Sequence, residues 1–326
     1  MNIGLFDADG HNFPSLPLMK ISAYHKSKGD NVEFASPLIH YDKLYCSRVF
    51  GDEYTTFSDV AFNANEVFYG GTGFAIKIKD GKEVFVKSKD TNLPPEIEHI
   101  YPDYSLYPEL THNTAYGFLT RGCPNDCGFC IVSQKEGRRS QKVADLSEFW
   151  RGQAHIKLLD PNLLACPDRM DLLRQLADSK AKVNFTQGLD ARFISEPVCE
   201  ALNLIHIERI HFAFDFMNNK KAITKGLTLF RKNSRLSDRS IIVYVLTNYD
   251  TNFIDDWYRI NAIRNAGMSP DIRIYRKSTA PRILNDLQRW CNNRFIFRSC
   301  EFWDYIPRAG GKTIKEIYPT EYLQCR

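Results

Sequence analysis

From residue 115 onward, short apolar runs of β type alternate with stretches whose apolar positions recur at helical spacing. The predicted strands cover residues 115–119, 156–159, 183–186, 209–214, 241–246 and 272–275. The predicted helices between and after them cover residues 169–179, 196–204, 220–232, 253–265 and 282–292. This alternation is typical of βαβ units around a parallel sheet. It predicts an α/β fold, either a partial (β/α)6 barrel or a doubly wound sheet, with functional residues at the carboxyl ends of the strands.

The first 75 residues predict a smaller layer of the same kind. An apolar run at residues 3–6 ends in Asp7–Gly10 turn chemistry, and a helical pattern at 18–29 leads to a second strand at 32–34. Further strands are predicted at residues 44–50 and 67–69. The pattern therefore predicts a Rossmann-like α/β domain over residues 1–75.

Two segments with a different pattern flank the larger repeat. Residues 76–113 begin with an alternating hairpin turning at Asp80 and Gly81, and continue as a linker rich in proline and tyrosine. Residues 294–326 form an aromatic and basic extension. The sequence thus predicts four parts: a domain at 1–75, a hairpin and linker at 76–113, a partial barrel at 114–293 and the extension at 294–326.

Composition limits the class of protein. Hydrophobic residues make up 43% of the 326 residues and charged residues 25%, which suits a folded chain with a sizeable core. There is no apolar run of the roughly 18 residues that a membrane helix needs, and the amino-terminal segment lacks the pattern of a secretion signal. We therefore expect a cytoplasmic protein without membrane contact. The nine cysteines argue for reduced thiols, some of which bind metal, rather than a disulfide framework.

Charge is unevenly distributed along the chain. Residues 1–120 hold 10 basic and 16 acidic groups, whereas residues 121–326 hold 33 and 23. A basic carboxyl-terminal part suits an anionic ligand or nucleic acid, but its lysines and arginines are scattered among carboxylates, which favours an ordinary solvated surface. Nucleic acid remains an open partner.

The most specific feature is the segment RGCPNDCGFC, which follows the first strand of the larger repeat. It places Cys123, Cys127 and Cys130 in CxxxCxxC spacing. Three thiolates in one short loop are able to ligate three irons of a [4Fe-4S] cluster, and the fourth iron then stays open to a small molecule. Gly122 and the neighbouring Pro124 and Gly128 favour tight turns, while Phe129 is placed to pack against a bound ligand.

This motif, with an aromatic residue before its last cysteine, resembles that of the radical S-adenosylmethionine (SAM) superfamily. The resemblance covers residues 115 to about 290. It implies a TIM-barrel-like partial barrel in which SAM chelates the open iron through its amino and carboxylate groups. It also implies that one electron, delivered by an external flavodoxin- or ferredoxin-like reductant, cleaves SAM to a 5′-deoxyadenosyl radical that abstracts hydrogen from a substrate. The substrate is not identified by the sequence.

The same resemblance implies further cofactor contacts at the later strand ends. The family's Gly-Gly-Glu-type element is absent after the second strand, where Asp160 and Asn162 are positional substitutes. The strand-end candidates are Gln187, Asp190 and Arg192 after the third strand, Asp215 after the fourth, and Thr247 with Asn248 after the fifth. A carboxylate such as Asp190 or Asp215 is equally suited to capping the next helix.

The amino-terminal layer is similar in layout to the cobalamin-binding domains that precede the barrel in one radical SAM branch. Domains that ligate cobalt through histidine carry DxHxxG, but here His11 is followed by Pro14 where glycine is expected. The residues therefore favour a degenerate relative without cofactor over a cobalamin-binding one.

Several alternatives remain at this stage. The cysteine loop also suits a zinc- or cluster-stabilised nucleic-acid-binding module whose basic, aromatic carboxyl-terminal part holds the ligand, although no second cysteine pair lies nearby. The glycines at residues 70–73 suit either a phosphate cradle or, more simply, a turn before the hairpin.

Overall fold

The computed structural model describes residues 1–10, 12–52, 54–55, 63–79, 82–308, 310–318 and 322. His11, Asp80 and Gly81, which figure in the sequence analysis, lie outside the described residues, as does Cys325, one of the nine cysteines. The chain divides into two compact units, Met1–Leu159 and Asp160–Arg326, which are described separately apart from the strand order of their shared sheet. Among the described residues, no helix has the length and apolar character needed to cross a membrane.

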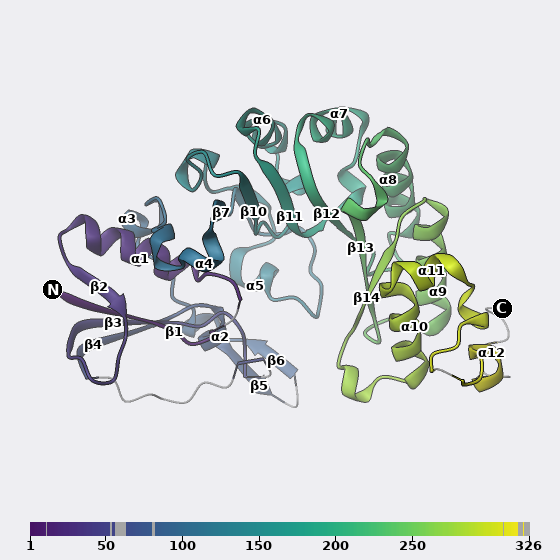
Figure 1. Ribbon diagram of the computed structural model, residues 1–326, viewed down its shortest axis with the longest axis horizontal. Helices are drawn as coiled ribbons and strands as arrows, with labels where there is room; N and C mark the ends of the chain where they lie inside the picture. Colours follow the sequence, from purple (N-terminus) through teal and green to yellow (C-terminus); the bar gives the residue numbers. More distant parts are fainter. Residues whose placement is uncertain are drawn as a thin grey trace. The chain divides into compact units, whose positions relative to one another are not determined.

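The first unit begins with a four-stranded parallel sheet in the order β2-β1-β3-β4 (Figure 1). Its strands and its first helix are β1 (Asn2–Asp7), α1 (Leu16–Ser27), β2 (Asn31–Phe34), β3 (Tyr41–Ser47) and β4 (Ala64–Gly70). The order reverses direction between β1 and β3, as in Rossmann-like sheets. The predicted α/β layer is therefore confirmed, although β3 begins and ends three residues earlier than expected and β4 is longer.

The connection from β2 to β3 is unusually short for a parallel crossover. Residues 35–40 carry the chain past β1 without a helix, whereas such connections usually need a dozen residues or more. The fully buried ring of Tyr41 lies so close to Gly4 that a Cβ there would approach the ring to 2.9 Å. The hydroxyl of Tyr41 accepts a hydrogen bond from the Ser36 amide at 2.9 Å and donates to Glu33 Oε1 at 3.1 Å. Glycine at position 4 thus makes room for the crossover.

A hydrophobic cluster joins β1 to α1 and to the short helix α3 (Pro95–Glu98). Its buried members are Ile3, Leu5, Leu18, Ile21 and Ile97. Leu93 and Leu106 pack against this cluster. The proline- and tyrosine-rich segment therefore packs on the amino-terminal sheet at these positions.

The predicted hairpin is confirmed by the antiparallel strands β5 (Ile76–Lys79) and β6 (Lys82–Phe85). The glycines before it form a turn into the four-residue helix α2 (Thr72–Ala75). A Cβ at Gly71, where φ is +100°, would lie 2.3 Å from the Arg48 carbonyl oxygen. These glycines therefore serve close backbone packing before the hairpin.

The remaining elements of the first unit are short. They are η1 (Lys87–Lys89), η2 (Tyr104–Leu106), α4 (Pro108–Thr111), β7 (Thr114–Gly117), β8 (Thr120–Arg121), α5 (Val132–Glu136), β9 (Gln141–Lys142), η3 (Leu146–Glu148) and β10 (His155–Leu158). Strands β7 and β10 pair in parallel, with Lys157 opposite Tyr116.

A six-stranded sheet has the order β14-β13-β12-β11-β10-β7 (Figure 1). Its later strands are β11 (Lys182–Leu189), β12 (His206–Ala213), β13 (Ile241–Thr247) and β14 (Pro270–Ile274), paired in parallel. The spatial order follows the chain without the reversal that a doubly wound sheet requires, which excludes that alternative. All six predicted strands are present.

The helices that follow these strands are α6 (Arg169–Ser179), α7 (Glu196–Leu204), α8 (Lys220–Asn233), α9 (Phe253–Asn265) and α10 (Arg282–Asn292). Their bounds agree with the predicted helices, α8 being one residue longer. The short elements of the second unit are η4 (Leu163–Ala165), η5 (Ala191–Phe193), η6 (Asp238–Ser240), η7 (Lys277–Thr279), α11 (Arg294–Ser299), η8 (Phe302–Asp304) and α12 (Ile314–Ile317).

The aromatic carboxyl-terminal extension packs on α9 and α10. The ring of Trp290 lies 4.7 Å from that of Phe297 and 5.4 Å from that of Phe302, and Trp257 lies 5.8 Å from Phe302. Trp290 and Phe302 are fully buried. These aromatic side chains therefore belong to the core of the second unit.

Candidate functional site

The cysteine loop is closed at its base by a small antiparallel ribbon. Strands β8 and β9 pair Thr120 with Lys142 and Arg121 with Gln141, so the residues between them form one long excursion. Within it, the amide of Cys123 donates to the Gly137 carbonyl at 3.1 Å, and the amide of Cys130 donates to the Cys127 carbonyl at 2.9 Å. All three cysteines are half-buried.

Gly122 anchors the start of the loop. Its φ is +84°, and a Cβ at this position would lie 2.1 Å from the Arg139 carbonyl oxygen. Its amide donates to Glu136 Oε2 at 3.0 Å, while Glu136 Oε1 pairs with Arg121 at 2.7 Å. The glycine is therefore required by the local backbone, because any side chain would displace the chain at Arg139.

The middle of the loop is tied to the helix that follows it. Asp126 accepts a hydrogen bond from the Ser133 hydroxyl at 2.9 Å and forms an ion pair with Arg138. Phe129, the aromatic residue before the last cysteine, is half-buried. The loop is therefore held at its base, its middle and its end.

The donor set suits iron–sulfur ligation, since cysteine thiolates hold cluster irons. Three sulfur donors lie within eight residues of chain, on a loop whose side chains are only partly covered. The fit is one of residue type and spacing, because in the described part of the chain no group of three or more His, Cys, Asp or Glu side chains is already arranged to hold a metal ion.

The other described cysteines have a different setting. Cys46, Cys166, Cys199 and Cys291 are buried, and Cys300 is half-buried. Burial raises the pKa of Cys199 and Cys291, which keeps them as neutral thiols. Packing in the core accounts for these side chains.

In the second unit, Asp160 and Asn162 follow the end of the preceding strand. Both are buried, with side chains 4% and 2% exposed. Asn162 is also the residue before the 3-10 turn η4. Their burial makes them part of the packed strand end.

Asp190 and Arg192 pair with each other. Asp190 Oδ1 accepts hydrogen bonds from the Arg192 amide at 3.1 Å and from its Nε at 2.8 Å, and Oδ2 accepts from Nη2. Asp190 thus caps the turn η5, the role that the sequence left open for it. Gln187 lies on β11 with an exposed side chain.

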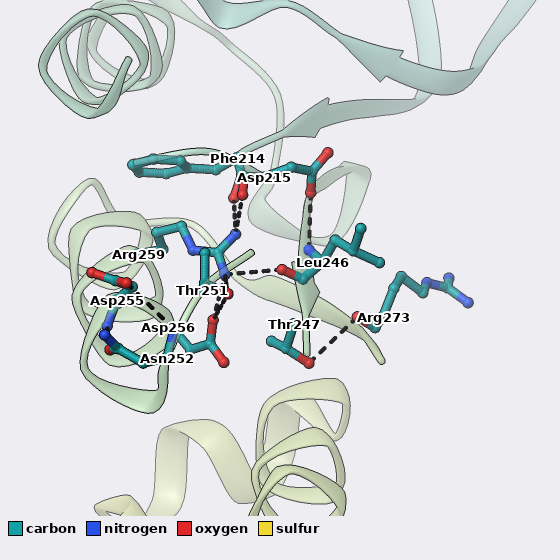
Figure 2. A network of polar contacts seen from close by, with 10 residues as sticks. All are labelled: Phe214, Asp215, Leu246, Thr247, Thr251, Asn252, Asp255, Asp256, Arg259 and Arg273. Carbon is teal, nitrogen blue, oxygen red and sulfur yellow. Dashed lines mark hydrogen bonds and ion pairs between the residues drawn. The ribbon is translucent and has the colours of Figure 1, made fainter. Parts of the chain in front are cut away.

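The ends of β12 and β13 are joined by the fully buried Arg259 of α9, shown in Figure 2. Its guanidinium donates to the carbonyls of Phe214, Asp215 and Leu246 at 2.8–2.9 Å. It also donates to the Thr251 hydroxyl at 3.1 Å and pairs with the buried Asp256.

The three predicted residues at these strand ends, Asp215, Thr247 and Asn248, make backbone contacts, and the first two are drawn in Figure 2. Asp215 accepts a hydrogen bond from the Leu246 amide at 2.9 Å, so it braces a neighbouring strand rather than capping a helix. Burial raises the pKa of Asp215, against the lowering effects of that amide and of Arg259. Thr247 is fully buried, with its hydroxyl 3.5 Å from the Arg273 carbonyl. Asn248 has φ +63°, and its side-chain Nδ2 donates to the Tyr275 carbonyl at 2.8 Å.

Sequence reasoning missed Arg259 and its partner. Asp256 and Arg259 occupy buried positions on the apolar face of α9, beside Phe253, Ile260 and Ile263. Two charges at i and i+3 on an otherwise apolar face were the available signal, because charges are buried almost only when they are paired.

A second missed group lies on the strands themselves. His211 on β12 stacks on Tyr244 of β13, with ring centroids 5.0 Å apart, and its Nδ1 lies 2.6 Å from the Phe185 carbonyl oxygen. Burial lowers the pKa of His211. Arg273 lies over the same tyrosine ring at 5.2 Å. The alternation of these residues with buried apolar ones was the signal in the sequence.

Comparison with known proteins adds no family assignment. No family model matches the chain, and no curated protein matches its sequence.

Proposed function

We propose that this protein is a radical SAM enzyme, in which Cys123, Cys127 and Cys130 hold a [4Fe-4S] cluster that leaves one iron to SAM. The observation that carries the proposal is the CxxxCxxC loop, which comes after the first strand of a six-stranded parallel sheet. The strand order, which follows the chain, supports the partial (β/α)6 barrel that such enzymes use. Once bound, the cluster and SAM supply one-electron cleavage of the sulfonium bond and hydrogen abstraction.

The chain's own residues bind the cluster and orient SAM. The three thiolates bind iron, and the half-buried state of their loop restricts water around them. Gly122 and Glu136 fix the backbone from which Cys123 projects. The exposed amide of Gln187, the Asp190–Arg192 pair and Asn248 are our candidates for orienting SAM, as the resemblance implies.

Anaerobic reconstitution with iron and sulfide tests the cluster, and a dithionite-driven assay for 5′-deoxyadenosine tests the chemistry. We expect about four irons per chain and SAM-dependent formation of 5′-deoxyadenosine. Replacing any of the three cysteines by alanine abolishes both. Cys300→Ala is the matched control and retains them, because Cys300 is half-buried elsewhere in the fold.

Two outcomes oppose the proposal. A wild-type protein that binds iron but never forms 5′-deoxyadenosine contradicts the enzymatic function. A tightly bound zinc ion without SAM affinity, together with salt-sensitive binding to oligonucleotides, favours the nucleic-acid-binding alternative.

The loop geometry gives a second test through two glycines. Gly122 and Gly152 both have positive φ, but a Cβ at Gly152, which lies outside the loop, has nothing within 4 Å, whereas one at Gly122 meets the Arg139 carbonyl. We expect Gly152→Ala to cost about 1–3 kcal/mol of stability through backbone strain and to keep full iron loading. Gly122→Ala moves the backbone next to Cys123 and lowers iron content. Equal iron content in the two variants would contradict the role given to Gly122.

A further inference from the structure

A cavity of about 1190 Å3 lies over β3 and β4, within the first unit. Helix α1 and residues 91–99 line it, and so do residues that flank the cysteine loop, Arg121 and Lys135 among them. Its size exceeds that of a typical small-molecule pocket. Of its lining residues, Gly70 and Gly71 belong to the glycine segment that the sequence analysis considered as either a phosphate cradle or a turn.

The floor of this cavity contains two aromatic rings in register. Tyr45 on β3 pairs with Phe68 on β4, and their rings are 5.0 Å apart with planes only 18° from parallel. Phe68 is 40% exposed, although it is a large apolar side chain. Aromatic rings stack favourably in offset, near-parallel arrangements. The floor is therefore suited to a planar ring.

A chain of hydrogen bonds holds the Tyr45 ring of this floor in place. Asp30 Oδ2 lies 2.7 Å from Nδ1 of the buried His25, and His25 Nε2 lies 3.0 Å from the Tyr45 hydroxyl. Burial raises the pKa of Tyr45, which keeps its hydroxyl protonated. The tyrosine ring is thus held in one orientation before any ligand arrives, which reduces the entropic cost of binding.

Two lysines at the cavity wall carry positive charge without a counter-ion. Lys28 lies over the Tyr24 ring at 4.0 Å, and Lys43 lies 5.7 Å from the centroid of Phe68. Neither forms an ion pair within the described part of the chain, although Glu66 is opposite Lys43 in the strand register. Other cations of the lining do pair, as Arg121 does with Glu136 at 2.7 Å. The charge around the ring floor therefore favours an anion.

We propose that this cavity binds a planar aromatic molecule that carries a phosphate and has the size of a nucleotide. Its ring lies on Tyr45 and Phe68, and its phosphate is held by Lys28 and Lys43. The site involves α1, β3 and β4 and does not depend on the chemistry proposed for the cysteine loop.

Calorimetric titration of the full chain with AMP and FMN, and with the uncharged adenosine and riboflavin, tests the proposal. We expect at least one of the two phosphates to bind about tenfold or more tightly than its uncharged counterpart, since charge-assisted hydrogen bonds are the strong ones. Lys28→Ala and Lys43→Ala each weaken phosphate binding by about tenfold, whereas Lys77→Ala, exposed and outside the cavity, leaves it unchanged. Phe68→Ala weakens the charged and uncharged ligands together.

The competing explanations give different results. Binding that survives Phe68→Ala but is lost in Cys123→Ala or displaced by SAM places the nucleotide at the cysteine loop and overturns the proposal. Equal affinity for phosphate and uncharged forms overturns it too, as does the absence of binding at about millimolar ligand. A dimer that dissociates on Phe68→Ala shows that a second copy covers this face, which also overturns it.

Discussion

The cavity over β3 and β4 and the carboxyl ends of β12 and β13 use charged side chains in opposite ways. At the strand ends, Arg259 is fully buried, and its hydrogen bonds go to oxygen atoms of the protein. At the cavity, Lys28 and Lys43 lie against aromatic rings without an ion pair in the described chain. A charge surrounded by protein acceptors stabilises the fold, whereas a charge at an open wall is available to a ligand.

The largest effect that this comparison predicts is at Arg259. Arg259→Met leaves Asp256 as a buried carboxylate without its partner and frees the carbonyls of two strand ends. Removing one member of a buried ion pair costs about 3–5 kcal/mol, and we expect a loss of that size in the free energy of unfolding. Urea unfolding monitored by tryptophan fluorescence measures it.

Arg273→Met is the matched control for that experiment. Arg273 is 60% exposed and pairs with Asp271 at 2.8 Å on the same strand. Exposed pairs contribute about 0–1 kcal/mol, so the control should unfold nearly as the wild type does. Similar losses in the two variants would show that the buried network does not hold the strand ends together.

The strand-end loops also show how far sequence alone reaches. Helical periodicity located α6, α7, α9 and α10 within their observed bounds, because each buries one apolar stripe. The residue types at the strand ends predicted hydrogen-bonding groups there, but not their partners. Asp215 accepts its hydrogen bond from the amide of Leu246, which lies on the neighbouring strand, 31 residues further along the chain. The local sequence around Asp215 does not indicate this partner.

The cavity was beyond sequence reasoning for a related reason. Its lining comes from α1, from β3 and β4 and from residues 91–99, and no local pattern shows that these segments meet. Phe68 and Tyr45 have the pattern of ordinary strand residues, and nothing in the local sequence indicates that Phe68 is 40% exposed. The cysteine loop could be predicted from the sequence, because its three cysteines lie within eight consecutive residues.

A smaller effect is expected at the hydrogen-bonded chain formed by Asp30, His25 and Tyr45. His25→Leu removes the link between Asp30 and Tyr45 and leaves both oxygens without that partner in a largely buried setting. Losing hydrogen bonds of this kind costs about 1–3 kcal/mol, measured by the same unfolding experiment. His99→Leu is the control, because His99 is 56% exposed and pairs with Glu148 at the surface. If His99→Leu loses as much unfolding free energy as His25→Leu, the buried hydrogen bonds of His25 do not stabilise the fold more than the surface ion pair of His99.

The smallest effect is a difference in pH dependence between the two regions. The hydrogen bond from His25, followed by that from the chain's amino group, lowers the pKa of Asp30 below 3.8. Burial instead raises the pKa of Asp215 above 3.8. The contribution of Asp30 to stability is therefore fully present above its unfolded pKa and is lost as pH falls through the folded one. For Asp215 the favourable contribution is present below pH 3.8 and is lost as pH rises through its folded pKa.

Asparagine at each position isolates these opposite slopes, because asparagine keeps the shape of the side chain and does not titrate. The difference in unfolding free energy between wild type and Asp30→Asn should grow as pH rises from about 3 to 5. The same difference for Asp215→Asn should fall as pH rises above about 4, because the wild type then carries a buried charge. Denaturant unfolding at half-unit pH steps measures both slopes. Slopes of the same sign would mean that the strand end is as open to water and counter-charge as the surroundings of Asp30, and the contrast between the two regions would then rest on Arg259 alone.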